Sequence, residues 1–257
     1  MKTIFVIIAS ILLLSQNIDA QICDSLSVND SLPKLNLSKT LIPDSAKHTR
    51  TDKYHFRSRQ LILPTILVGT GIMGLTSDWM EYQNHEMKDE LRENIDKKIT
   101  IDDFSQYAPF ISVYALDLCG VKGEHNLRDY TAILATSYLL MGVTVNALKM
   151  CIREQRPDNS SFNSFPSGHT ATAFMGAELL RHEFRHVSPW IGVAGYAVAA
   201  GTGFFRMYNN RHWFTDILAG AGIGILSAKA SYWLFPYISK KLFKKKRNNS
   251  IDVIQTY

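Results

Sequence analysis

Three short clusters in the second half of the chain combine basic, imidazole and carboxylate side chains. They supply three fixed cations, two histidines, one carboxylate and a serine next to a glycine. Such a set is suited to binding a phosphate group and transferring it through a side chain, because phosphate needs positive charge around it and a nucleophile beside it. The clusters are Lys149 with Arg156-Pro157, Pro166-Ser167-Gly168-His169, and Arg206 with His212 and Asp216.

The three cations suit the charge of a phosphate ester. A phosphate monoester carries close to two negative charges near neutral pH, and its hydrolysis spreads charge over three equatorial oxygens. Arg156 and Arg206 can each hold two oxygens through planar, paired donors, whereas Lys149 supplies a compact charge. A single lysine at the end of an apolar helix would equally fit a side chain that reaches for the surface. The prediction therefore depends on the three cations together.

The second cluster lies between a polar loop and an apolar run, where a helix is expected to begin. Ser167 is a good N-cap residue, and Gly168 lets the backbone approach a ligand closely. The free N–H groups and the dipole of such a helix start favour an oxyanion. An ordinary capped helix with a surface histidine, His169, would show the same pattern.

In the third cluster His212 and Asp216 are four residues apart, so they share one face of a helix. The carboxylate can accept from one imidazole nitrogen and leave the other unprotonated for attack on a substrate. A helix salt bridge and a pair of metal ligands are the alternatives. Zinc would want a third protein ligand. His169 is the only obvious one and the cations would repel a metal, so we expect no metal and no other cofactor.

The combination is more specific than its parts. Lys-x6-Arg-Pro, Pro-Ser-Gly-His and Arg-x5-His-x3-Asp, in this order, resemble the type 2 phosphatidic acid phosphatase superfamily. That superfamily includes membrane lipid phosphatases, soluble bacterial class A acid phosphatases and vanadium haloperoxidases. The resemblance covers about residues 105–236. One departure is that the third motif usually begins Ser-Arg, whereas Phe205 precedes Arg206 here, which would remove one hydrogen bond to phosphate and lower the rate.

The resemblance also implies a role for each residue. The three cations, Ser167 and the amide of Gly168 would bind phosphate oxygens. His212 would attack phosphorus and become a phosphohistidine, and Asp216 would orient it. His169 would be the general acid for the leaving oxygen and would assist the water that later frees phosphate. The family works without a metal, which agrees with the cation-rich clusters.

Apolar runs with helical spacing surround the clusters, and no run alternates with period two. We therefore expect an all-α fold, a membrane-embedded bundle with a core of about six helices. An exposed amphipathic helix is expected over residues 79–98. Residues 130–148 are the best candidate for a membrane span, since several other runs are shorter than the about 20 residues that a span needs. The expected apolar helices are residues 61–76, 107–119, 130–148, 170–180, 190–205 and 213–235.

The chain divides into four regions by composition. The net charge of +5 is concentrated near the C-terminus, which favours anionic lipid headgroups rather than nucleic acid as a partner. Three cysteines form neither a metal pattern nor a disulfide framework, and Cys119 and Cys151 are expected to be buried. The regions are a signal peptide or anchor (1–20), a polar arm with an apolar and an amphipathic helix (21–104), a phosphatase core domain (105–236) and a basic tail (237–257).

Basic residues also predict an orientation. The tail and the segment 181–186 belong in the cytoplasm by the positive-inside rule, which places Lys149, His169 and His212 together on the periplasmic side. The number of spans stays open. A cleaved signal followed by three spans before Lys149 would put that lysine inside.

The sequence therefore favours a metal-independent phosphatase of the inner membrane, facing the periplasm. Phosphatidic acid, phosphatidylglycerol phosphate, isoprenyl pyrophosphate and lipid A phosphate are all open as substrates. The alternatives are a soluble periplasmic acid phosphatase for small phosphomonoesters, a vanadium haloperoxidase with vanadate on His212, and a non-enzymatic phospholipid-binding protein. Neither the lipid nor the oligomeric state is predicted.

Overall fold

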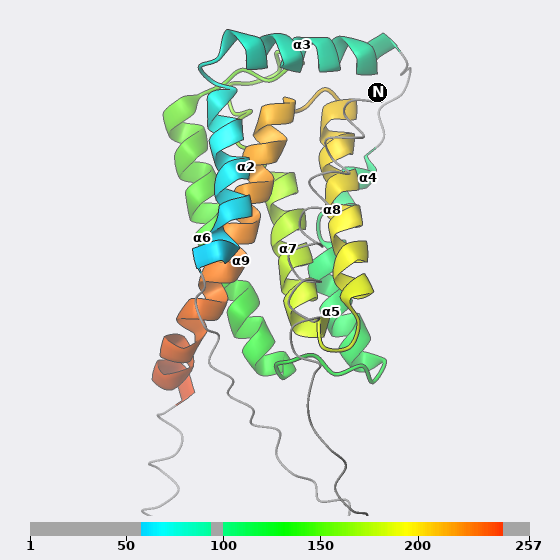
Figure 1. The fold of residues 1–257 in the computed structure, drawn as a ribbon, viewed down its shortest axis with the longest axis vertical. Helices are drawn as coiled ribbons and strands as arrows, with labels where there is room; N and C mark the ends of the chain where they lie inside the picture. Colours follow the sequence, from blue (N-terminus) through cyan, green and yellow to red (C-terminus); the bar gives the residue numbers. More distant parts are fainter. Residues whose placement is uncertain (1–57, 94–99, 244–257) are drawn as a thin grey trace, which may run out of the picture. The chain divides into compact units, whose positions relative to one another are not determined.

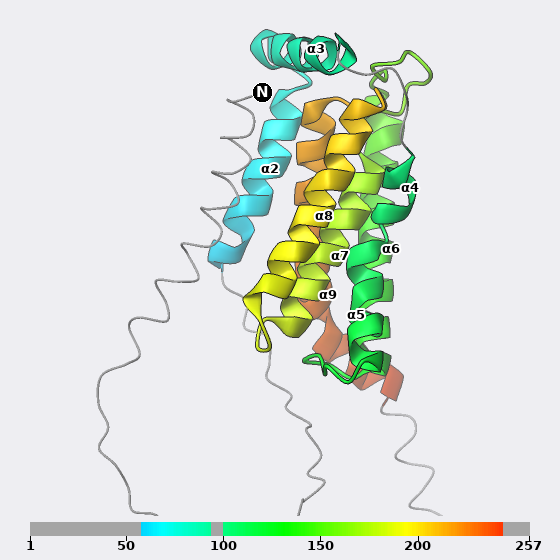
Figure 2. The ribbon, with the colours of Figure 1, turned by 90° about the vertical axis from the view of Figure 1, so that its right-hand side faces the viewer.

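The computed structural model describes residues 58–93 and 100–243, so the predicted signal, most of the polar arm and most of the basic tail lie outside the described residues. Within the described part the chain is helical and has no strand, which confirms the predicted all-α class. Figures 1 and 2 show the arrangement of the helices. The elements are η1 (Ser58–Leu61), α2 (Ile62–Met73), α3 (Asp78–Glu93), α4 (Ile101–Ser105), α5 (Ala108–Leu118), α6 (Leu127–Ile152), α7 (Gly168–Phe184), α8 (Pro189–Tyr208) and α9 (Phe214–Phe243).

The central helix is α7, which packs against α5, α6, α8 and α9. Its side chains are buried on nearly every side, and Met175, Leu179 and Phe184 are 0% exposed. Burial of one such side chain stabilises the fold by about 1.5–3 kcal/mol. The helix that begins at the second cluster is therefore held by packing on nearly all of its faces.

Close approach of α9 to α7 depends on two glycines. A Cβ atom on Gly220 would lie 2.5 Å from the carbonyl oxygen of Ser167, and one on Gly224 would collide with the carbonyl oxygen of Ala171. No side chain fits at either position without separating the helices. Since α7 and α9 begin at the second and third clusters, this contact also sets the distance between those clusters.

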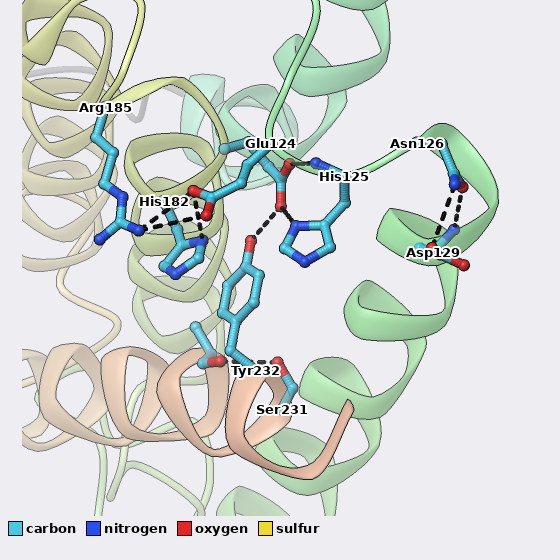
Figure 3. Close-up of polar contacts among 10 residues, drawn as sticks. Glu124, His125, Asn126, Asp129, His182, Arg185, Ser231 and Tyr232 are labelled. Carbon is cyan, nitrogen blue, oxygen red and sulfur yellow. Dashed lines mark hydrogen bonds and ion pairs between the residues drawn. The ribbon is translucent and has the colours of Figure 1, made fainter. Parts of the chain in front are cut away.

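A polar cluster joins the helices at the end of the bundle opposite the start of α7. The buried Glu183 carboxylate accepts hydrogen bonds from His125 Nδ1 (2.9 Å), from the His125 amide (2.8 Å) and from the Tyr232 hydroxyl (2.7 Å). Figure 3 shows His125, His182 and Tyr232 converging there. Ligand atoms of His125, His182 and Glu183 lie within 4.8 Å of one another, as in some metal sites. Both oxygens of Glu183 already have protein donors, so the cluster is explained as an anchor between the α5–α6 loop, α7 and α9.

Two of the described helices are long and apolar enough to cross a membrane, Leu127–Ile152 and Phe214–Lys241. A third span results if residues 58–73 and 78–91, which meet at 90°, are counted as one. The outer face of α6 is apolar, with Leu139 66% and Val143 62% exposed. A bundle that leaves such side chains uncovered is suited to lipid, which agrees with the predicted membrane embedding.

The prediction for the cysteines is wrong. Cys119 and Cys151 are both exposed and unpaired. Cys119 is the C-cap residue of α5 and Cys151 lies in the last turn of α6, on faces that no described helix covers. Their small size and low polarity do not lead to burial here, because both cysteines lie at the end of a helix, where their side chains reach solvent or lipid.

Candidate active site

The predicted site residues lie at one end of the bundle, where α6 and α8 end and α7 and α9 begin. The alternating direction of these helices brings together segments that are far apart in the sequence. Helix α3 lies across this end, as Figures 1 and 2 show. The residues placed there are Lys149, Arg156, Ser167, Gly168, His169, Arg206, His212 and Asp216.

His212 and Asp216 form a buried pair. His212 Nδ1 lies 3.4 Å from Asp216 Oδ2, and the two residues are 3% and 0% exposed. The same carboxylate oxygen accepts from the Ser164 hydroxyl at 2.5 Å and from the Trp213 amide at 2.9 Å. These donors fix Asp216 from two sides, so the carboxylate can orient the imidazole next to it.

The surroundings of His212 keep its imidazole neutral. Burial lowers its pKa to about 4, because it outweighs the hydrogen bond and charge of Asp216, and the charges of Arg206 and Lys149 act in the same direction as burial. A neutral imidazole at pH 7 has a free lone pair. The arrangement therefore supplies a nucleophile that does not first have to lose a proton.

Two cations of the first cluster lie beside this pair. Lys149 Nζ donates to the carbonyl oxygens of Asn163 and Ser164, which holds the ammonium group over the loop before α7. The buried Nε of Arg156 has no hydrogen-bond partner within the described residues. Burial lowers the pKa of Arg156, and the charges of Arg206 and Arg211 lower it further. An anion held among these cations would relieve that repulsion.

The start of α7 differs in one respect from the prediction. Ser167 occupies the N-cap position, but its side chain makes no capping hydrogen bond and instead pairs with the Thr170 hydroxyl at 2.9 Å. The helix amides therefore keep their capacity to bind another acceptor. A Cβ atom on Gly168 would meet only Val145, at 3.8 Å. Any need for glycine at this position would come from a ligand rather than from packing.

Arg206 and His169 contact carboxylates that the motifs do not include. Arg206 Nη1 donates to the buried Asp102 Oδ2 at 2.6 Å, and Asn209 Nδ2 donates to Asp102 Oδ1 at 2.9 Å. Asp103 Oδ1 lies 3.1 Å from His169 Nε2 and 3.6 Å from Arg206 Nη1. Helix α4 therefore contacts the site, although the predicted core domain begins only at residue 105, the last residue of this helix.

Glu154 is a second carboxyl group that the motifs do not include. Burial raises its pKa to about 9, and the charge of Asp216 and a hydrogen bond to it act in the same direction. The group is therefore protonated at neutral pH and adds no negative charge next to the cations of the three clusters.

Helix α3 and the third cluster enclose a small pocket. Its lining includes His212, Pro157, Lys88 and Trp213. Lys88 Nζ lies 5.4 Å from the ring centroid of Trp213, and Asn84 Nδ2 donates to the Thr215 hydroxyl at 2.9 Å. The amphipathic helix predicted from the sequence thus lines the same pocket as His212.

Residues 130–240 match the model of a protein family described as the PAP2 superfamily. The matched range contains all three clusters and confirms the resemblance predicted from them. Helix α4 lies outside it.

Individual proteins match this chain over only part of their own length. A lipid A 1-phosphatase of Porphyromonas gingivalis is 44% identical over 137 residues, which are 52% of this chain and 30% of that protein. A lipid A 1-phosphatase of Rhizobium etli is 32% identical over 110 residues, 36% of this chain and 45% of that protein. The chain thus spans less than half the length of either relative. A crystal structure of Aquifex aeolicus LpxE has a TM-score of 0.45 and 24% identity, over 58% of this chain and 94% of that one.

Proposed function

We propose that this chain, whose residues 130–240 match the model of the PAP2 superfamily, is a phosphoric ester hydrolase of the cell envelope that removes phosphate from a membrane lipid. The observation that carries the proposal is the buried pair of His212 and Asp216 beside Lys149 and Arg206. A neutral imidazole held by a carboxylate and surrounded by cations is what attack on a phosphate dianion requires.

The reaction would run in two steps. His212 Nε2 attacks phosphorus, the P–N bond forms, and the P–O bond to the lipid breaks as His169 donates a proton to the leaving oxygen. Water then attacks the phosphohistidine, the P–N bond breaks, and His169 takes the proton of the water. Asp216 accepts from His212 Nδ1 throughout. Lys149 and Arg156 bind the equatorial oxygens, together with the other residues that the motifs name: Arg206, Ser167 and the Gly168 amide.

No residue of this scheme needs a metal ion. The three cations supply the positive charge that a metal would otherwise bring to the phosphate. We therefore expect activity in the presence of a chelator.

The substrate is proposed to be a phosphorylated lipid because the site lies at the end of an apolar bundle. Two candidate spans and the exposed apolar face of α6 would hold that bundle in lipid. Both curated relatives described above carry the name lipid A 1-phosphatase. The 1-phosphate of lipid A is therefore the first substrate to test, followed by phosphatidic acid, phosphatidylglycerol phosphate and isoprenyl pyrophosphate.

The site is proposed to face the periplasm. Lys240 and Lys241 lie in the last turn of α9, and Arg181 and Arg185 lie near the end of α7, all at the end of the bundle away from His212. The positive-inside rule assigns that end to the cytoplasm. A cysteine-specific reagent that does not cross the membrane would test this orientation at Cys151, which is exposed at the end of α6 nearest the site.

The experiment that tests the function is phosphate release from the four lipids and from a soluble ester. Wild type is compared with His212→Ala, with and without a chelator. We expect one lipid to be preferred, a loss of about 10⁴-fold or more in His212→Ala, and no effect of the chelator. Unchanged activity in His212→Ala refutes the mechanism. Preference for the soluble ester supports the soluble acid phosphatase, and vanadate-dependent halide oxidation supports the haloperoxidase.

A further inference from the structure

Helix α4 brings two adjacent carboxylates to the phosphate-binding end of the bundle. Asp102 is 1% exposed and is held by Arg206 and Asn209. The Asp103 side chain is 53% exposed and contacts His169 and Arg206. Both residues lie outside residues 130–240, so the family match does not assign them a role.

We propose that Asp102 and Asp103 are positioning residues of the site, with Asp102 fixing the phosphate-binding Arg206 and Asp103 holding His169 ready to donate its proton. The inference rests on the proposed function. Helix α4 would then contribute to two steps of the reaction. Asp102 would support the binding of phosphate, and Asp103 would support protonation of the leaving oxygen.

Asp102 acts through geometry. One oxygen accepts from Arg206 in the last turn of α8, and the other accepts from Asn209, the C-cap residue of that helix. These two bonds fix the carboxylate, which in turn restricts rotation of the guanidinium group. A buried arginine with a single anchored nitrogen keeps its remaining donors directed to one place. The 2.6 Å contact is short because both partners are charged and almost fully buried.

Asp103 acts through charge as well as geometry. Its carboxylate engages His169 Nε2, which leaves Nδ1 as the ring atom that can face the leaving oxygen. Burial lowers the pKa of His169 and the charge of Arg206 lowers it further, whereas the charge and hydrogen bond of Asp103 and the charge of Asp102 oppose that shift and favour the imidazolium. Without Asp103 the imidazolium would face Arg206 with only one carboxylate nearby. The proton would then be lost from His169 at a lower pH.

Burial and hydrogen bonding also keep α4 in place. The Ser105 hydroxyl lies 2.8 Å from the Thr202 hydroxyl on α8, and Gln106 Nε2 donates to the Asp103 carbonyl at 2.9 Å. The first contact holds α4 against α8, and the second stabilises the end of α4 itself.

The test uses Asp103→Asn in the full-length protein, because that exposed side chain can change without leaving a buried charge unpaired. For a lipid phosphate we expect kcat at pH 7 to fall by about 10- to 100-fold, within the range that general acid catalysis contributes. The alkaline limb of the kcat profile should move to lower pH. The loss should be smaller for an aryl phosphate than for an alkyl phosphate that wild type also hydrolyses, because a phenolate needs less help from an acid.

Inhibition by inorganic phosphate separates a positioning role from a structural one. Asp103→Asn should bind phosphate as tightly as wild type or more tightly, because a nearby negative charge is gone. Asp102→Asn should bind phosphate more weakly, since Arg206 loses its anchor. Asp129→Asn, the same change at the opposite end of the bundle, should leave both measurements unaffected.

The inference is overturned if Asp103→Asn keeps the wild-type kcat and pH profile, or if its kcat falls equally for all leaving groups while phosphate binding weakens. These measurements are made only on a protein whose activity is abolished by His212→Ala. Activity that survives His212→Ala would contradict the proposed function itself, whatever the Asp103 variants do.

Discussion

The backbone amide of Ser167 donates a hydrogen bond to the backbone carbonyl of Asp216 at 3.1 Å. This bond joins the start of α7 directly to the start of α9, and thus the second cluster to the third. The relative position of His169 and His212 consequently depends on how closely these two helices approach. Gly220 sits at the point of contact, where it faces the carbonyl oxygen of Ser167.

Gly220→Ala should therefore damage the site without touching a catalytic side chain. The added Cβ atom would lie 2.5 Å from the Ser167 oxygen, so the helices must separate. We expect a loss of about 1–3 kcal/mol in the free energy of unfolding, typical of overpacking, and a lower kcat. Thermal unfolding in detergent and phosphate release measure the two effects.

Gly201→Ala is the matched control, since a Cβ atom on Gly201 of α8 meets nothing within 4 Å. Alanine is the better helix former, so this variant should be as stable as wild type or slightly more stable. Equal behaviour of the two variants would contradict the role assigned to the α7–α9 contact.

The acidic limb of the activity profile should report His212. Its lowered pKa, about 4, means that the imidazole stays neutral as the pH falls and is protonated only near that value. We expect kcat/KM to decline near pH 4 rather than near 6.5, the usual value for histidine. Protonation of the substrate phosphate could also produce an acidic limb, so the profile is measured with two esters whose phosphate pKa values differ. A limb due to the substrate moves with the ester, whereas a limb due to His212 stays at the same pH. A protein limb at pH 6 or above would show that His212 is not held neutral.

Much of this architecture could be predicted from the sequence. Helical spacing of apolar residues predicted the runs that became α2, α5, α6, α7, α8 and α9, since amphipathic or apolar periodicity is a local property. The motif spacing likewise identified a set of residues that the fold gathers at one end. His212 and Asp216 are four residues apart on one helix, so even their pairing is local.

What the sequence did not reveal depends on contacts between distant segments. Asp102 reaches Arg206 across 104 positions, and α4 has only five residues, too few to show periodicity. Ser164 and Glu154 lie in the loop between α6 and α7, where only the folded chain brings them to Asp216. One signal in the sequence could have identified α4. Asp102 and Asp103 are adjacent acidic residues just before an apolar helix, and such carboxylates are expected to pair with the cations of the motifs.

Glu154 yields a prediction for a second loss of activity, at a higher pH than the loss of the proton from His169. Its raised pKa, about 9, keeps the carboxyl group neutral at pH 7, and ionisation at higher pH would place a negative charge beside Asp216 and the phosphate site. Glu154→Gln should thus change kcat at pH 7 by less than about tenfold, the effect of one altered hydrogen bond. The wild-type loss of activity as the pH rises through about 9 should be weaker in the variant. Both are read from rate profiles between pH 6 and about 10.

Asp158→Asn provides the control for Glu154. Burial raises the pKa of Asp158, but hydrogen bonds from Ser160 and the charges of Arg211 and Arg156 outweigh burial and lower it. This carboxylate is therefore already ionised across the whole alkaline range, and its removal should not alter the limb. A limb that is unchanged in Glu154→Gln would assign the alkaline loss to another group.

Phe205 tests whether the departure from the usual Ser-Arg motif limits the rate. Its ring packs against those of Phe204 and Tyr208, at centroid distances of 5.8 and 5.9 Å, near the end of α8 that carries Arg206. Phe205→Ser should raise kcat/KM by up to about tenfold if the hydroxyl gains one hydrogen bond to phosphate, while the lost packing lowers the unfolding temperature.

The control variant is Phe204→Ser. Phe204 is 44% exposed, and its replacement removes a neighbouring phenyl group without placing a hydroxyl next to Arg206 in the motif. A gain in Phe205→Ser but not in Phe204→Ser would assign the effect to the hydroxyl. An unchanged or lower kcat/KM in a folded Phe205→Ser would mean that Arg206 and the amides of α7 already satisfy the phosphate oxygens.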